Sequence, residues 1–170
     1  MKKYLVIGNP VEHSLSPKLH NYWIKENNIN AVYDKKRIDE SELKNIVSEV
    51  KEGKISGINV TVPFKRTIIP FLDKLSPEAE DTQSVNTIYL QDGKIIGHNT
   101  DIAGFELAIK YSKYDLVSKR IFVLGAGGVA PSIIYSLRKM KVSKITLSNR
   151  TKEKSENLKN LFEDIEIVEW

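Results

Sequence analysis

The feature of this sequence that most constrains its fold is a glycine turn between a strand pattern and a helix pattern. Residues 120–124 are typical of a strand, residues 125–128 form the turn, and residues 129–140 have helical spacing. A strand pattern at 144–147, a helix pattern at 152–162 and a last strand pattern at 165–168 follow. This βαβαβ order predicts the first half of a doubly wound, Rossmann-like nucleotide-binding domain.

The glycine turn predicts a dinucleotide site, because glycine lets backbone N–H groups approach a pyrophosphate. A tight turn without a ligand is the alternative. Alanine in place of the third glycine is tolerated by this fingerprint. The residues expected to contact the cofactor here are Gly125, Ala126, Gly127, Gly128, Val129 and Ala130.

The segment after the second strand indicates which dinucleotide binds. NAD sites usually carry an acidic residue there, whereas this chain has Asn149, Arg150 and Thr151, with Lys154 one turn further on. Arg150 offers a planar fork for a 2′-phosphate. The alternative is an ordinary helix cap with surface cations. The sequence therefore predicts NADP as the cofactor.

The first hundred residues also alternate strand and helix patterns, which predicts an α/β fold. Strands are expected at 4–8, 31–36 and 55–61, helices at 16–28 and 39–52, and a short helical region at 68–72. Residues 85–90 and 94–96 flank Gln91-Asp92-Gly93, which predicts a hairpin. A helix from Asp101 to about residue 111 follows. We expect an α/β substrate-binding catalytic domain over residues 1–101 and half of an NADP-binding Rossmann domain over 102–170.

Polar residues lie after the first predicted strand and at the carboxyl end of the third. Ser14 and Ser16 precede a helix and form a donor-rich site for a carboxylate, unless Ser16 merely caps the helix with Pro17 at its first position. Asn59 and Thr61 point to one side of a strand, and Val60 and Val62 to the other. They lie at a carboxyl end, where α/β proteins bind ligands.

Three further residues suit a reaction on a hydroxylated substrate, two as a candidate acid/base couple and one as a hydrogen-bonding partner. Lys65 follows the turn at Pro63; it is either a surface lysine or, beside a polar pocket, a proton donor to a forming alkoxide. Asn86 can both donate and accept hydrogen bonds. Asp101 either caps a helix or pairs with Lys65, and sequence spacing leaves open whether the two meet.

Composition narrows the function classes. The chain has no cysteine, which excludes disulfides and thiolate metal sites, and we expect no metal. Its 26 lysines and arginines are scattered among 22 acidic residues, which argues against a nucleic-acid partner. The apolar run at the N-terminus is too short for a signal peptide, and no stretch is long enough for a membrane span. We therefore expect a cytoplasmic protein.

Six segments, in this order, resemble those of shikimate dehydrogenases, and the resemblance spans the whole chain. They are SLSP at 14–17, NVTVPFK at 59–65, VNT at 85–87, GHNTD at 97–101, GAGG at 125–128 and NRT at 149–151. The resemblance implies an oxidoreductase that reversibly reduces 3-dehydroshikimate to shikimate with NADPH, in the pathway to chorismate and the aromatic amino acids.

The resemblance also implies a role for each matching residue. Lys65 is the acid/base residue with Asp101 as its partner, and residues 149–151 match the 2′-phosphate segment. Lys154 stands where an arginine is common, so bidentate phosphate binding is less expected there. The implied substrate contacts are Ser14 and Ser16 to the carboxylate, and Asn59, Thr61, Asn86 and Asp101 to the hydroxyls.

Two alternatives stay open at this point. One is a quinate/shikimate dehydrogenase that uses NAD, against which Arg150 argues. The other is a non-catalytic shikimate-binding fragment, because family members continue for roughly another hundred residues that complete the nucleotide domain. The sequence leaves the oligomeric state open, a homodimer included.

Overall fold

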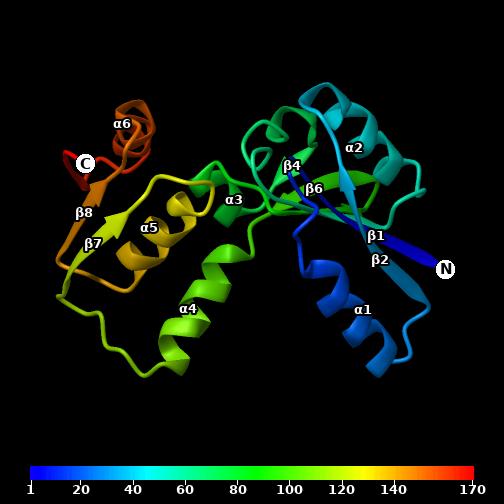
Figure 1. Ribbon diagram of the computed structural model, residues 1–170, viewed down its shortest axis with the longest axis horizontal. Coiled ribbons are helices and arrows are strands. Elements are labelled where there is room, and N and C mark those ends of the chain that lie inside the picture. Colours follow the sequence, from blue (N-terminus) through cyan, green and yellow to red (C-terminus); the bar gives the residue numbers. More distant parts are fainter. The chain divides into compact units, whose positions relative to one another are not determined.

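The computed structural model describes residues 1–170 as two compact units, Met1–Asn99 and Thr100–Trp170 (Figure 1). The first unit contains a six-stranded sheet in the order β2-β1-β3-β5-β6-β4, in which only β5 runs against its neighbours. Two 3-10 helices lie at Glu40–Glu42 and Ile69–Phe71. Its elements are β1 (Lys2–Gly8), α1 (Ser16–Glu26), β2 (Ala31–Arg37), α2 (Leu43–Lys51), β3 (Gly57–Val60), β4 (Lys74–Leu75), α3 (Pro77–Thr82), β5 (Thr87–Gln91) and β6 (Lys94–His98).

Helices cover both faces of this sheet near β1, with α1 on one side and α2 on the other (Figure 1). The α2 face buries the strand residues Leu5, Ile7, Ile58 and Val60 together with four apolar residues of α2. The opposite face buries Val6 and Tyr33. Burial on two sides explains the continuous apolar run in β1, since a strand with one wet face alternates apolar and polar residues.

The topology brings the ends of several strands to one edge of the sheet. Along the chain, β2 lies on one side of β1 and β3 on the other, so the strand order reverses at β1. In open α/β sheets, ligands bind at such a switch point, beyond the carboxyl ends of the strands. The segments after β1 and β3, with the residue before β5, therefore meet at the edge where a ligand is expected.

The second unit contains three parallel strands in the order β7-β8-β9. Its apolar core includes Ile134, Leu147, Leu158 and Phe162. This arrangement confirms the predicted α/β fold with a Rossmann-like half. Its elements are α4 (Asp101–Tyr111), β7 (Arg120–Leu124), α5 (Ala130–Lys139), β8 (Lys144–Ser148), α6 (Lys152–Leu161) and β9 (Glu166–Val168).

The strand β7 lies at the edge of this small sheet, so one side of its backbone has no neighbouring strand. Phe122 and Leu124 project from β7 with 55% and 72% of their surface exposed. Ile121 and Val123, which alternate with them, pack against the core beneath. No helix of the structure combines the length and the apolar character that a membrane crossing needs.

The structure differs from the sequence-based expectation at the start of α1, at the end of β3 and between Phe71 and β5. Ser16 is the first residue of α1 rather than its cap; the Ser14 hydroxyl accepts a hydrogen bond from the Ser16 N–H at 3.3 Å instead. The alternation in β3 stops at Val60, because the chain turns before Pro63 and leaves Val62 54% exposed. Helix α3 was not predicted, although Ser76 caps it by accepting from the Ala79 N–H at 3.3 Å.

We expect Gly8→Ala to destabilise the first unit. A Cβ at Gly8 would lie 2.6 Å from Thr61 Cγ2 and 3.0 Å from the Val62 carbonyl oxygen. Overpacking of this kind costs about 1–3 kcal/mol of unfolding free energy. Denaturant unfolding measures the loss. Gly104→Ala is the matched control, because a Cβ meets no atom within 4 Å there and alanine favours a helix. Equal stability of the two variants would contradict the expected clash.

Candidate functional site

Asn59 lies at the centre of a hydrogen-bond network near the carboxyl end of β3. Its Oδ1 accepts from the Tyr33 hydroxyl at 2.7 Å. Its Nδ2 donates to the Asn86 carbonyl oxygen at 3.2 Å and to Thr87 Oγ1 at 3.1 Å. The register explains this contact, since Asn59 and Thr87 are direct partners across β3 and β5. The structure thus brings Asn59 and Asn86 together, as expected for residues of one site.

The network fixes the orientation of the Asn59 amide. The Asn86 carbonyl can only accept a hydrogen bond, so the amide nitrogen must face it. Both N–H groups of Asn59 are then engaged, and Oδ1 keeps one lone pair beyond the bond from Tyr33. The half-buried Asn59 side chain can therefore act as an acceptor toward a hydroxyl group.

The two serines lie close to this network. Ser14 and Ser16 are half-buried at the start of α1, and Ser16 lies beside the phenol of Tyr33. Burial raises the pKa of Tyr33 to about 12, against a smaller lowering by Ser16. The phenol is therefore protonated at neutral pH and remains a hydrogen-bond donor.

An aromatic stack holds Tyr33 against α1. The His20 ring lies parallel to the Tyr33 ring, with 4.2 Å between centroids and 6° between planes. Burial lowers the pKa of His20 below its ordinary value of 6.5, because a charged imidazole loses hydration in this position. The neutral form is thus the one that the folded protein favours.

Thr61 and Lys65 follow β3 at the same edge of the sheet. The Thr61 N–H donates to the Ile7 carbonyl at 2.9 Å, which continues the pairing with β1. Lys65 is half-buried between the buried Phe64 and Ile68. Its carbonyl accepts from the Val85 N–H at 2.8 Å, one residue before Asn86. The backbone of Lys65 is therefore anchored beside the strand that carries Asn86.

Asp101 is the first residue of α4, with Thr100 at the cap position and no hydrogen bond from a capping side chain. It belongs to the second unit, whereas Lys65 belongs to the first. The acid/base pairing of Lys65 with Asp101 stays a prediction.

The glycine turn joins β7 to α5. Gly125 has φ +104°, which favours glycine, and its N–H donates to the Ser148 carbonyl at 2.8 Å. A Cβ at Gly125 or Gly127 would meet no atom within 4 Å, so the backbone there is open to a ligand. Gly128 and Val129 are exposed, and Ala130 begins α5 as a buried residue.

Asn149 connects the glycine turn to the segment before α6. Its Oδ1 accepts from the Ala126 N–H at 3.0 Å, and its Nδ2 donates to the Thr151 carbonyl at 2.7 Å. Arg150, Thr151 and Lys154 are exposed, and the Thr151 side chain makes no capping hydrogen bond. Exposed cations and a hydroxyl at a helix N-terminus suit a phosphate. This donor set, together with the open turn, fits a phosphorylated dinucleotide.

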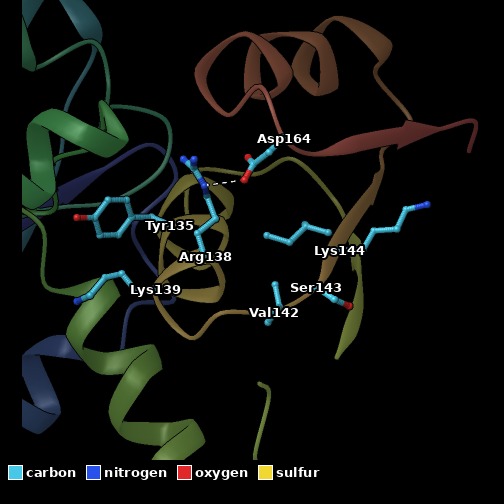
Figure 2. A pocket seen from close by; sticks show the side chains of 8 residues that line it. Tyr135, Arg138, Lys139, Val142, Ser143, Lys144 and Asp164 are labelled. Carbon is cyan, nitrogen blue, oxygen red and sulfur yellow. Dashed lines mark ion pairs between the residues drawn. The ribbon is translucent and has the colours of Figure 1, made fainter. Parts of the chain in front are cut away.

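A separate pocket in the second unit lies at the carboxyl end of α5 and the amino end of β8, away from the glycine turn. Figure 2 shows Arg138 turned toward Asp164, with Nε and Oδ2 3.0 Å apart. The pocket's other cations, Lys139 and Lys144, are paired with Glu106 and Glu166 at 2.8 and 2.7 Å. Since the glycine turn is at the carboxyl ends of the strands, this pocket is distinct from the expected cofactor site. Its lining consists of Tyr135, Arg138, Lys139, Val142, Ser143, Lys144, Ile145 and Asp164.

Sequence reasoning missed two members of the network around Asn59. Tyr33 gave no signal, because its role depends on its reach across the sheet. Thr87 stood in a segment already singled out, and its hydroxyl donates to Asn86 Oδ1 at 3.0 Å. The cross-strand pairing of Asn59 with Thr87 was the information needed to assign it.

Comparison with known proteins assigns both units. A family model described as shikimate dehydrogenase substrate binding domain matches residues 6–88, and one described as shikimate / quinate 5-dehydrogenase matches residues 106–169. A shikimate dehydrogenase (NADP(+)) from Pelagibacter ubique is 56% identical over 169 residues, which are 99% of this chain and 64% of that protein. The chain spans 58% to 64% of the length of this and two further relatives of the same name.

Solved structures agree with these matches. The crystal structure of shikimate dehydrogenase from Aquifex aeolicus superposes with a TM-score of 0.91 at 44% identity, covering 99% of this chain and 62% of that one. Shikimate 5-dehydrogenase from Thermus thermophilus, in complex with NADP(H) and shikimate, has a TM-score of 0.87 at 32% identity, with 99% and 63% coverage.

We expect acidification to destabilise the first unit partly through His20. Its folded pKa is lowered, so below pH 6.5 the unfolded chain binds the proton first and stability falls as pH falls toward the folded pKa. His20→Phe keeps a stacking ring and removes this proton. Thermal unfolding between pH 7.5 and 5 should therefore show the variant losing less stability than the natural chain. Parallel pH curves for the two proteins would contradict this expectation.

Proposed function

Because the chain belongs to the shikimate dehydrogenase family, we propose that it acts in the reversible, NADPH-dependent reduction of 3-dehydroshikimate to shikimate. The observation that carries the proposal is the polar network around Asn59 at the carboxyl edge of the first sheet. Oriented amides and hydroxyls next to a half-buried lysine suit a small, polyhydroxylated acid.

The proposed binding roles follow from the kind of group at each position. Ser14 and Ser16 donate to the substrate carboxylate at the start of α1, where the helix dipole favours an anion. The ring hydroxyls contact Asn59, whose free lone pair accepts a hydrogen bond from one of them. The other proposed contacts to the hydroxyls are Thr61, Asn86 and Asp101.

The proposed chemistry assigns the proton to Lys65. The ketone oxygen becomes an alkoxide as its carbon is reduced, and the Lys65 ammonium donates a proton to that oxygen. In the reverse direction Lys65 accepts the hydroxyl proton, and Asp101 stabilises the charged lysine as its partner. When bound, NADPH supplies the hydride.

The proposed cofactor site uses the open turn and the exposed cations of the second unit. The backbone of Gly125, Ala126, Gly127, Gly128, Val129 and Ala130 faces the pyrophosphate, and Arg150, Thr151 and Lys154 hold the 2′-phosphate. Asn149 holds the two segments together through the hydrogen bonds that it makes to each.

A second candidate substrate is quinate, because the model that matches residues 106–169 is described as shikimate / quinate 5-dehydrogenase. Quinate is also a hydroxylated cyclic acid, so the same network would bind it. The proposal further includes a cytoplasmic location, which the lack of cysteine fits. The proposal leaves two oligomeric states to be distinguished by experiment, a monomer and a homodimer.

The first experiment measures absorbance at the reduced-nicotinamide band after shikimate or quinate is added with NADP or NAD. NADP-dependent turnover of shikimate supports the proposal. Turnover of quinate alone favours the second candidate. If turnover is absent, calorimetry with shikimate distinguishes a substrate-binding fragment, which binds, from a failed proposal, in which nothing binds.

We expect Lys65→Ala to lower kcat by about a hundred- to ten-thousand-fold, the usual contribution of a general acid. KM should change less, because the proton is needed chiefly in the transition state. The assay is NADP-dependent oxidation of shikimate by a chain that turns over, with Lys44→Ala on the exposed side of α2 as control. An unchanged kcat would remove Lys65 from the mechanism.

We expect Arg150→Ala to weaken NADP binding by about ten- to a hundredfold, as for a lost hydrogen bond to a charged group. NAD binding should hardly change, because NAD lacks the 2′-phosphate. Calorimetry with each nucleotide measures both constants. Lys152→Ala removes an equal charge that is paired with Glu156 at 3.7 Å, and serves as control. Equal losses for NADP and NAD would refute the assignment of Arg150.

A further inference from the structure

Tyr33 reaches across a strand to contact the candidate site. It lies on β2, whereas Asn59 lies on β3, and β1 runs between them. Tyr33 is the register partner of Tyr4, and Asn59 is that of Val6, two positions further along β1. These four residues share one face of the sheet, since side chains of a strand alternate. The Tyr33 ring therefore extends over β1, and its hydroxyl meets Asn59 Oδ1 at 2.7 Å.

The ring is held on more than one side. It is only 5% exposed, and His20 stacks on it with centroids 4.2 Å apart. Asn21, the next residue of α1, accepts from the Tyr33 N–H at 3.0 Å and donates to the Tyr33 carbonyl at 2.7 Å. Helix α1 thus fixes both the backbone and the ring of Tyr33, so the position of the hydroxyl is set before any ligand binds.

This hydroxyl contacts a residue with a proposed role in substrate binding. Asn59, which accepts from it, belongs to the hydroxyl-binding group. The donors of Asn59 are already engaged by Asn86 and Thr87. The bond from Tyr33 then leaves a single lone pair on Oδ1 for a ligand, and it determines the direction in which that lone pair points.

We propose that Tyr33 is a positioning residue of the substrate site, whose hydroxyl orients the Asn59 amide toward a ring hydroxyl of one hydroxylated acid. The inference rests on the proposed function, because it assigns Tyr33 a task only if Asn59 holds the substrate. Tyr33 acts on the ligand through Asn59 and does not touch the ligand itself. Its contribution is to lower the cost of ordering a substrate-binding side chain, which is how preorganisation raises affinity.

Tyr33→Phe tests the proposal, since it keeps the ring that stacks on His20 and removes only the hydroxyl. We expect the dissociation constant for shikimate, measured by calorimetry, to rise about three- to tenfold, as for one lost hydrogen bond. The constant for NADP should stay unchanged. Tyr4→Phe is the matched control: Tyr4 lies on the same face of β1, and no hydrogen bond joins its hydroxyl to the network. Equal shikimate affinity in the natural chain and in Tyr33→Phe would overturn the inference.

A second measurement separates positioning from a general loss of packing. Shikimate analogues that each lack one ring hydroxyl are bound to the natural chain and to Tyr33→Phe. If Tyr33 acts through Asn59, the effect of the substitution shrinks for the analogue without the hydroxyl that Asn59 accepts. An effect of the same size for every analogue would overturn the inference, because a packing defect does not distinguish ligands.

Thr87→Val offers an independent route to the same result, because it removes a different partner of Asn59. The double variant with Tyr33→Phe should lose less affinity than the sum of the single losses, since both substitutions act through one amide. Strictly additive losses would argue against a shared action on Asn59. Failure of the natural chain to bind shikimate would overturn the proposed function itself, whereas binding that Tyr33→Phe leaves intact overturns this inference alone.

Discussion

The close approach of β1 to the segment after β3 is the constraint on which the first unit depends. Gly8 ends β1 where a side chain would collide with Thr61 and the Val62 carbonyl, so only glycine leaves room for the segment after β3. Hydrogen bonds from Thr61 to Ile7 and from Asn9 to Val62 continue the pairing past the end of the sheet. This pairing places three candidate site residues, since Asn59 lies next to the last residue of β3 and Ser14 and Lys65 follow β1 and β3.

Local sequence patterns predicted those helices and turns that depend on residues close together in the sequence. The spacing of Leu43, Ile46, Val47 and Val50 predicted α2 because these residues form one apolar face of the helix, which packs on the sheet. The glycine turn was readable because a positive φ is needed at one point, Gly125, between a strand and a helix. Strand β4, with only two residues, is too short to show alternation, and its pairing with β6 could not be predicted.

The sequence identified most residues of the candidate site but not the contacts between them. Asn59 and Asn86 were each identified, but their contact arises from a backbone carbonyl and a register that no local pattern encodes. Capping by Ser16 was one of two interpretations, because serine before proline is a common helix start. In the structure Ser16 begins α1, and its N–H donates to the Ser14 hydroxyl. Tyr33 was not singled out, because its hydroxyl acts two strands away from its own backbone.

The open edge of β7 has a consequence for how the sheet of the second unit can grow. In doubly wound sheets the strand that precedes the glycine turn has parallel strands on both sides, whereas here only the side of β8 is occupied. Along β7 the only charged side chain is Arg120, while Phe122 and Leu124 lie exposed beside the open backbone. Proteins usually blunt a sheet edge with charge, proline or a bulge. The edge of β7 carries little of this protection, so it is the place at which a further strand can extend the sheet.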